Sequence, residues 1–247
     1  MTTPALVSED GERKLYEQDT TPPDECATTV VLPPSVFRLG RLPGQYVLLL
    51  VPTANREEQL WLQSLLQDHV GEYTLVTYAY EVDTEIEQLY HDTVTEGLTN
   101  RLMAMIVVTE SSVQILEELG IGTVIIGVVE NYIRTSKHND AAVDFGVAVF
   151  YDVGTGELVQ TTTQGVPVQP SFLCEAQEQG LSSVRRRADS VTYGDIVQKY
   201  FGGPARQRYG SDFDIGKDWH RVVCGSSRYD LLRDACRVTL NNWSTLK

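Results

Sequence analysis

The sequence predicts an α/β protein: a mixed β-sheet with packed helices, followed by an irregular, basic C-terminal segment that ends in a helix. Apolar runs typical of strands alternate with helical patterns in the first 120 residues, and three strand patterns then follow one another. A hydrophobic content of 42% is that of an ordinary globular chain. With 247 residues, the chain can bury a sizeable core as one domain with an appended segment.

Periodicity and turn residues place each element. A continuous apolar run at 45–51, ended by Pro52, is typical of a strand buried on both faces. Helical spacing of apolar residues over 57–70, stopped by Gly71, indicates an amphipathic helix. The same criteria predict, in order, a strand at 73–82, a helix at 83–105, a strand at Met105–Thr109, a short helix at 111–120, and strands at 123–133, 142–151 and 157–163.

The turn at 152–156 joins the last two of these strands into a hairpin, and its glycines can supply positive φ. Gly154-Thr155-Gly156 is not a phosphate-binding loop, because it lacks the Lys-Ser/Thr end of such a loop and no helix follows it.

Four segments describe the domain organisation. Residues 1–40 are expected to be a flexible lead-in, and 41–166 the α/β core. Residues 167–225 are expected to be irregular and basic, apart from a short helix at Tyr193–Phe201. Within 226–247, Ser227 and Asp230 resemble a capping box, which predicts a C-terminal helix packed on the core.

The net charge of −14 is unevenly distributed. Residues 1–180 carry a balance of −19, whereas residues 181–247 carry +5. The acidic bulk repels phosphate backbones and argues against a dedicated nucleic-acid-binding protein. No apolar run is long enough to cross a bilayer, although peripheral membrane association stays open.

The one distinctive local composition is a basic cluster with interleaved aromatic residues. As a binding surface it would dock an acidic partner, a headgroup or a phosphate, because arginine makes bidentate contacts and aromatic rings stack. Alternatively, it lies against the acidic body of the same chain. The candidate partner-binding residues are Arg185, Arg186, Arg187, Lys199, Arg206 and Arg208.

No catalytic, metal-binding or cofactor-binding motif is recognisable. The four histidines have no metal-ligand spacing, and no Gly-x-Ser-x-Gly elbow occurs. Glycines at 120, 122 and 127 follow a helix and enter a strand, which is the reverse of a dinucleotide-binding motif. We therefore expect no cofactor and no metal. The four cysteines are either disulfide-bonded in an oxidising compartment or buried free thiols.

The stretch 83–165 resembles a bacterial envelope family that includes the curli-secretion lipoprotein, activators of penicillin-binding proteins and TolB amino-terminal-like domains. A long helix is followed by Ser112-Val-Gln-Ile-Leu-Glu-Glu-Leu-Gly120 and Thr123-Val-Ile-Ile-Gly-Val-Val129. The strand–turn–strand containing Tyr151-Asp-Val-Gly-Thr-Gly-Glu157 is most similar to the family. Cys26 is not preceded by a lipobox. The resemblance implies a periplasmic or outer-membrane-associated domain that contacts other proteins and needs no cofactor.

The leading functional hypothesis is a non-enzymatic envelope accessory or assembly protein that acts through protein–protein contacts, with other envelope proteins or with further copies of itself as a homo-oligomer. The first alternative is a cytoplasmic α/β enzyme or small-ligand binder with its site at the carboxyl ends of the strands, in loops after Val51, Tyr80 and Val108. The second alternative is a secreted factor that binds anionic surfaces through its basic C-terminal segment.

Overall fold

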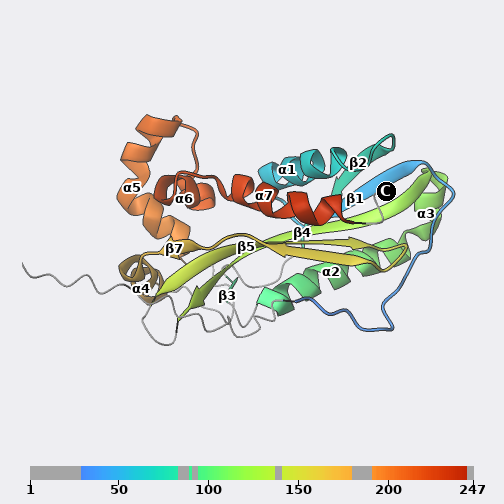
Figure 1. Cartoon of the computed structure of the whole chain (residues 1–247), viewed down its shortest axis with the longest axis horizontal. Coiled ribbons are helices and arrows are strands. Elements are labelled where there is room, and N and C mark those ends of the chain that lie inside the picture. The colour runs from blue at the N-terminus through green and yellow to red at the C-terminus, as the bar shows by residue number, and fades with distance from the viewer. Residues whose placement is uncertain (1–28, 83–88, 91–93, 137–140, 180–190, 244–247) are drawn as a thin grey trace, which may run out of the picture.

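The described part of the computed structural model is a seven-stranded mixed sheet with helices on both faces (Figure 1). It comprises residues 29–82, 89–90, 94–136, 141–179 and 191–243. The predicted fold class is therefore confirmed. The elements are β1 (Tyr46–Val51), α1 (Arg56–Gln67), β2 (Thr74–Ala79), β3 (Leu89–Tyr90), α2 (Val94–Ser111), α3 (Val113–Glu118), β4 (Ile121–Thr135), β5 (Ala142–Asp152), β6 (Leu158–Thr162), β7 (Val166–Val168), α4 (Pro170–Glu178), α5 (Tyr193–Tyr209), α6 (Ile215–Val223) and α7 (Arg228–Asn241).

The strand order creates a switch point at β1. The order is β2-β1-β4-β5-β6, with β3 paired to β4 and β7 paired to β5. β1 is parallel to both β2 and β4; β1 and β2 end at the same edge of the sheet, and β4 passes this edge and continues to Thr135. The chain leaves β1 through α1 to reach β2 on one side, and arrives at β4 on the other side through α2 and α3. In open α/β sheets, ligands bind at the carboxyl ends of strands where the order reverses in this way.

Two apolar clusters lie on opposite faces of the sheet. α2 and α3 cover the face that presents Leu48 and Ile126, whereas α1 and α7 cover the face that presents Leu49 and Ile125 (Figure 1). Successive side chains of a strand point to opposite faces, so a strand covered on both sides needs apolar residues at every position. The burial of every residue from Val47 to Val51 confirms that prediction.

A third apolar cluster lies at the far end of the β4–β5 pair. There β7, α4, α5 and α6 pack around Ile133 and Ala142 (Figure 1). The rings of Tyr193 and Trp219 meet edge to face within it, with centroids 4.8 Å apart. This end of the molecule therefore has its own packed layer of helices.

The segment 167–225, expected to be irregular, is largely helical where the structure describes it. Each of its helices buries at most two Leu, Ile or Val side chains, alongside small, aromatic or polar residues, so little aliphatic periodicity is left in the sequence. The helix predicted at Tyr193–Phe201 begins with a capping box of Thr192 and Asp195. It continues through Pro204 to Tyr209, and Ala205 of its second half is buried in the third apolar cluster.

The predicted strand at Met105–Thr109 is wrong, since these residues form part of α2. Leu98, Leu102, Met105, Ile106 and Thr109 are buried on one continuous helical face. A short apolar run fits a buried helix as well as a strand, and here it extends a helix that already covers the sheet. The first part of the predicted helix, 83–88 and 91–93, lies outside the described residues, and Leu89–Tyr90 is a strand.

The expected flexible lead-in also needs correction at 29–40, because this part packs on the core. Val30 is buried, and its N–H donates to Oε1 of Gln160 at 3.0 Å. The N–H of Leu39 donates to the carbonyl of Val153 at 2.9 Å. Residues 1–28 lie outside the described residues.

The hairpin and the C-terminal helix are confirmed. β5 and β6 pair antiparallel across the turn, in which Gly156, but not Gly154, has a positive φ of 78°. The hydroxyl of Ser227 caps α7 by accepting from the N–H of Tyr229 at 3.2 Å. Within the described ranges, no helix is both long and apolar enough to cross a membrane.

Candidate functional site

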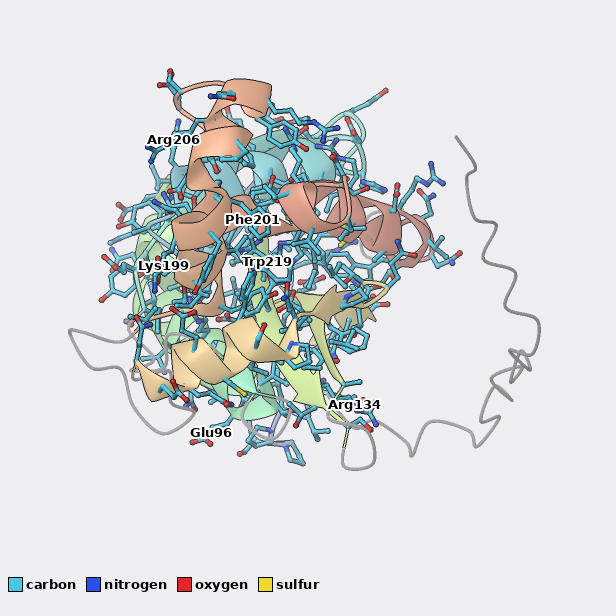
Figure 2. The ribbon with its side chains drawn as sticks, turned by 90° about the vertical axis from the view of Figure 1, so that its left-hand side faces the viewer. Glu96, Arg134, Lys199, Phe201, Arg206 and Trp219 are labelled. Carbon is cyan, nitrogen blue, oxygen red and sulfur yellow. The ribbon has the colours of Figure 1, made fainter. Side chains whose placement is uncertain are left out.

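The predicted basic residues that the structure describes all lie on α5, at the far end of the molecule. Figure 2 shows Lys199 and Arg206 projecting from this helix. Lys199 is engaged by α4, with its Nζ 2.5 Å from Oε1 of Glu175. The lysine bond lowers the pKa of Glu175, and the hydroxyl of Tyr200 adds a second bond to the same carboxylate at 2.8 Å. Arg185, Arg186 and Arg187 lie outside the described residues.

The surface beside α5 has both signs of charge. Arg206 and Arg208 are exposed, and Arg208 lies over the ring of Tyr209, 5.3 Å from its centroid. An open groove next to Arg206 also contains three aspartates, Asp195, Asp212 and Asp214. The described part of the predicted basic patch is therefore not a surface of one sign.

A group of buried and half-buried charged side chains lies at the switch point instead. We call it the strand-end cluster, and it consists of Glu58, Arg101, Glu130 and Arg228. Nε of Arg101 lies 2.5 Å from Oε1 of Glu130, and its Nη1 donates to the carbonyl of Pro52 at 3.1 Å. Because Pro52 directly follows β1, this bond places the Arg101 guanidinium at the carboxyl end of that strand.

Each acidic residue of the cluster occupies a position that an apolar residue would normally take. Glu58 starts the face of α1 that continues with Trp61, Leu62 and Leu65, and only 8% of it is exposed. Glu130 follows Val129 in β4, beyond the point where β1 ends. Buried carboxylates are rare in proteins unless they are paired or functional.

Burial changes the acidity of both glutamates. It raises the pKa of Glu58 from 4.5 to about 7, with a further increase from the negative charge of Glu130. The positive charges of Arg228 and Arg101 act in the opposite direction. Burial likewise raises the pKa of Glu130, although Arg101 opposes this. Glu58 therefore exchanges its proton near neutral pH, which is the condition for general acid–base catalysis.

The N-termini of two helices converge on the same place. α1 begins after Asn55, and α7 begins with Arg228 and Tyr229. Nδ2 of Asn55 lies 3.4 Å from the hydroxyl of Tyr229, which joins the two helix starts. The positive ends of the helix dipoles favour a negative charge at this junction.

A second polar group, next to the first, surrounds a narrow pocket, with Arg228 in its wall. We call it the histidine pocket. Nε2 of His220 lies 2.8 Å from Oδ2 of Asp144, and Nδ2 of Asn131 donates to the same oxygen at 2.9 Å. The ring of Trp219 stacks on His220 with centroids 4.0 Å apart. Arg228 thus belongs to both groups.

Neither group has the composition of a metal centre. Among the described residues, no three His, Cys, Asp or Glu side chains come close enough together to hold a metal ion. The strand-end cluster offers two carboxylates and two guanidinium groups, which suits an anionic ligand and proton transfer.

Neither group was predicted from the sequence, in which His220 has no metal-ligand spacing. Of the loops expected to form a strand-end site, after Val51, Tyr80 and Val108, the last does not exist, because Val108 lies inside α2. The sequence signal that could have indicated the cluster is a charged residue on the apolar face of a predicted helix, as with Glu58 in α1. Nothing in the sequence showed that Arg228, at the start of the last helix, lies near Glu58.

No protein-family model and no curated protein matches this sequence. The fold and the charged switch point define an open α/β sheet with a candidate ligand site at its strand ends. Among solved structures, the chain is similar to protein VC0702 from Vibrio cholerae, with a TM-score of 0.52 and 13% sequence identity. The match covers 78% of this chain and 93% of that protein. At this identity the similarity shows a common fold.

Proposed function

We propose that this protein binds a small anionic ligand, of the phosphate-bearing kind, at the strand-end cluster and exchanges a proton with it through Glu58. This is the class of enzyme or small-ligand binder with its site at the strand carboxyl ends. The observation that carries the proposal is a buried glutamate, with a pKa of about 7, under the charges of Arg228 and Arg101 at the switch point.

The anionic character of the ligand follows from the groups that converge there. Two guanidinium groups can each make bidentate contacts to phosphate or carboxylate oxygens. The N-termini of α1 and α7 add positive partial charge. Arg101 is held by Glu130 and Pro52, which leaves Arg228 as the principal ligand-binding side chain.

Glu58 supports a catalytic role as well as binding. A general acid or base is most effective when its pKa lies near the working pH. Glu58 meets this condition because burial raises its pKa to about 7. In the protonated state it can donate to a leaving oxygen of the ligand, and in the ionised state it can accept a proton from an attacking water.

Calorimetric titration with inorganic pyrophosphate tests the proposal. We expect the wild-type protein to bind it and Arg228→Gln to weaken binding roughly tenfold or more, as for loss of a charge-assisted contact. Arg233→Gln is the matched control, because Arg233 is exposed on the same helix and pairs only weakly with Asp230, at 4.0 Å. Equal affinity of wild type and Arg228→Gln would refute the proposal.

The envelope role suggested by the family resemblance is a separate proposal, in which the protein acts through protein–protein contacts in the periplasm. The feature that favours such contacts is β2, an edge strand without charged residues. Val76 and Tyr78 on this strand are 43% and 54% exposed. Sedimentation velocity of the wild type and of Tyr78→Lys tests self-association. A dimeric wild type and a monomeric Tyr78→Lys variant would support this role, whereas a monomeric wild type would argue against it.

A further inference from the structure

The main chain of Arg228 is held by a side chain from the preceding helix. The N–H of Arg228 donates to Oδ1 of Asp218 at 2.8 Å. Asp218 lies at a kink in α6, with φ −134° and ψ 49°, and its other oxygen lies 3.5 Å from Nε of Arg221. The position where α7 starts is therefore set by the position of this kink.

The kink is in turn fixed to the sheet two residues further on. His220 bonds to Asp144 of β5 at 2.8 Å, and the side chains of both residues are almost fully buried, with 4% and 2% exposed. Asn131 of β4 bonds to the same carboxylate. Figure 2 shows the neighbouring Trp219 in the interior beside α5, where it further restricts this turn of α6.

Three buried polar atoms around the histidine pocket have no hydrogen-bond partner among the described residues: Oδ1 of Asn131, Nδ1 of His220 and Nε of Arg228. The pocket has no room for a water molecule to bridge them. Buried polar atoms without partners cost stability, and a group of them in one place calls for a functional reason.

We propose that the His220–Asp144 pair is a positioning device that aligns Arg228 in the strand-end cluster. This inference rests on the proposed function of that cluster. His220 does not touch the ligand. It anchors α6 to β5, α6 holds the start of α7 through Asp218, and the start of α7 directs the Arg228 guanidinium toward Glu58. Only four residues, 224–227, separate α6 from α7, so a shift of the kink is transmitted to Arg228.

A double-mutant cycle on inorganic pyrophosphate binding tests this inference. We expect His220→Leu to weaken binding roughly tenfold, and to have no further effect in the Arg228→Gln background, because the positioned group is then absent. His220→Gln, which retains a donor for Asp144, is expected to restore affinity to within about threefold of wild type.

Leu173→Ala is the control for an effect of lost stability alone. It truncates a buried side chain of α4 in the third apolar cluster, which also contains Trp219. It is expected to lower the melting temperature without changing the dissociation constant. If His220→Leu does not fold, Asp218→Ala tests the same link, because it removes the acceptor of the Arg228 N–H. It is likewise expected to weaken binding only while Arg228 is present.

The outcomes separate the two proposals. If Arg228→Gln weakens binding but His220→Leu or Asp218→Ala has no effect, or an equal effect in both backgrounds, the positioning role is overturned and the proposed function stands. If Arg228→Gln binds pyrophosphate like the wild type, the proposed function fails and the positioning role fails with it.

Discussion

Asn55, which caps the first helix, and Tyr229, in the first turn of the last helix, are in contact, with Nδ2 and the hydroxyl 3.4 Å apart. The Tyr229 ring also packs against Trp61, with centroids 6.0 Å apart. The candidate site is therefore built where the two ends of the folded sequence come together. Its integrity depends on α7 as much as on the strands.

Tyr229→Phe is expected to be mild. It keeps the ring against Trp61 and removes a long hydrogen bond, so the loss should be about 1 kcal/mol or less. Tyr229→Ala also removes the ring packing and should cost clearly more. Urea unfolding of both variants provides the measurement. Equal losses would mean that the hydroxyl, and not the ring, holds the two helices together.

Glu58→Gln is expected to stabilise the protein above pH 7. In the folded state the pKa of Glu58 is about 7 rather than 4.5, so between these values the folded protein binds more protons than the unfolded chain. Wild-type stability therefore falls as pH rises through this window, by on the order of 3 kcal/mol in total. Glutamine does not ionise and avoids this loss.

Urea unfolding at pH 4.5 and pH 8 tests this, with Glu57→Gln as the control because Glu57 is exposed next to it. The gain of Glu58→Gln over wild type should be larger at pH 8 than at pH 4.5, and Glu57→Gln should show no such difference. A loss of stability at pH 8 on replacing Glu58 would contradict the raised pKa.

Anion binding is expected to weaken as pH rises from 6 to 8. Ionisation of Glu58 places a negative charge beside the Arg228 and Arg101 guanidinium groups, where it competes with the ligand. Sulfate is the suitable probe, because its own charge is constant over this range. We expect roughly a tenfold loss of affinity, equivalent to about 1.4 kcal/mol of repulsion. In Glu58→Gln the affinity should not depend on pH; a pH-independent wild type would place the anion away from Glu58.

The described cysteines should differ in their reaction with iodoacetamide. Cys174 and Cys224 are exposed free thiols, whereas Cys236 is buried in α7 and burial raises its pKa to about 12. Since the thiolate is the nucleophile, native protein should be labelled at the first two and at Cys236 only after unfolding. Peptide mass mapping with and without urea distinguishes them. If Cys174 or Cys224 resists labelling without reductant in protein from its native source, an oxidising compartment is favoured.

Most of the sheet could be predicted from the sequence because its strands have strong local signals. The run 45–51 and the hairpin around 152–156 are determined by apolar patterning and turn residues within a few positions. The strand predicted at Met105–Thr109 failed because its apolar residues satisfy both periodicities in a short window. Only the packing of α2 under the sheet decides between them.

The candidate site could not be predicted, because it depends on contacts between residues far apart in the sequence. Glu58 and Arg228 are separated by most of the chain, and His220 finds Asp144 across 76 positions. The spacing of the histidines in the sequence does not predict this contact, because the partner of His220 is a carboxylate on a distant strand. Apart from the helix at Tyr193–Phe201, the helices of 167–225 were not predicted, because small and aromatic residues such as Ala176 and Trp219 contribute much of their packing.

The length of β4 has a consequence for how the protein unfolds. Its fifteen residues, Ile121–Thr135, pass from the layer under α2 into the cluster formed by α4, α5 and α6. The two ends of the molecule are therefore not joined by a linker that would let one melt while the other stays intact. We expect the described chain to unfold in a single cooperative transition, and removal of everything after Val168 to leave the outer half of the β4–β5 ribbon without the helices that bury it.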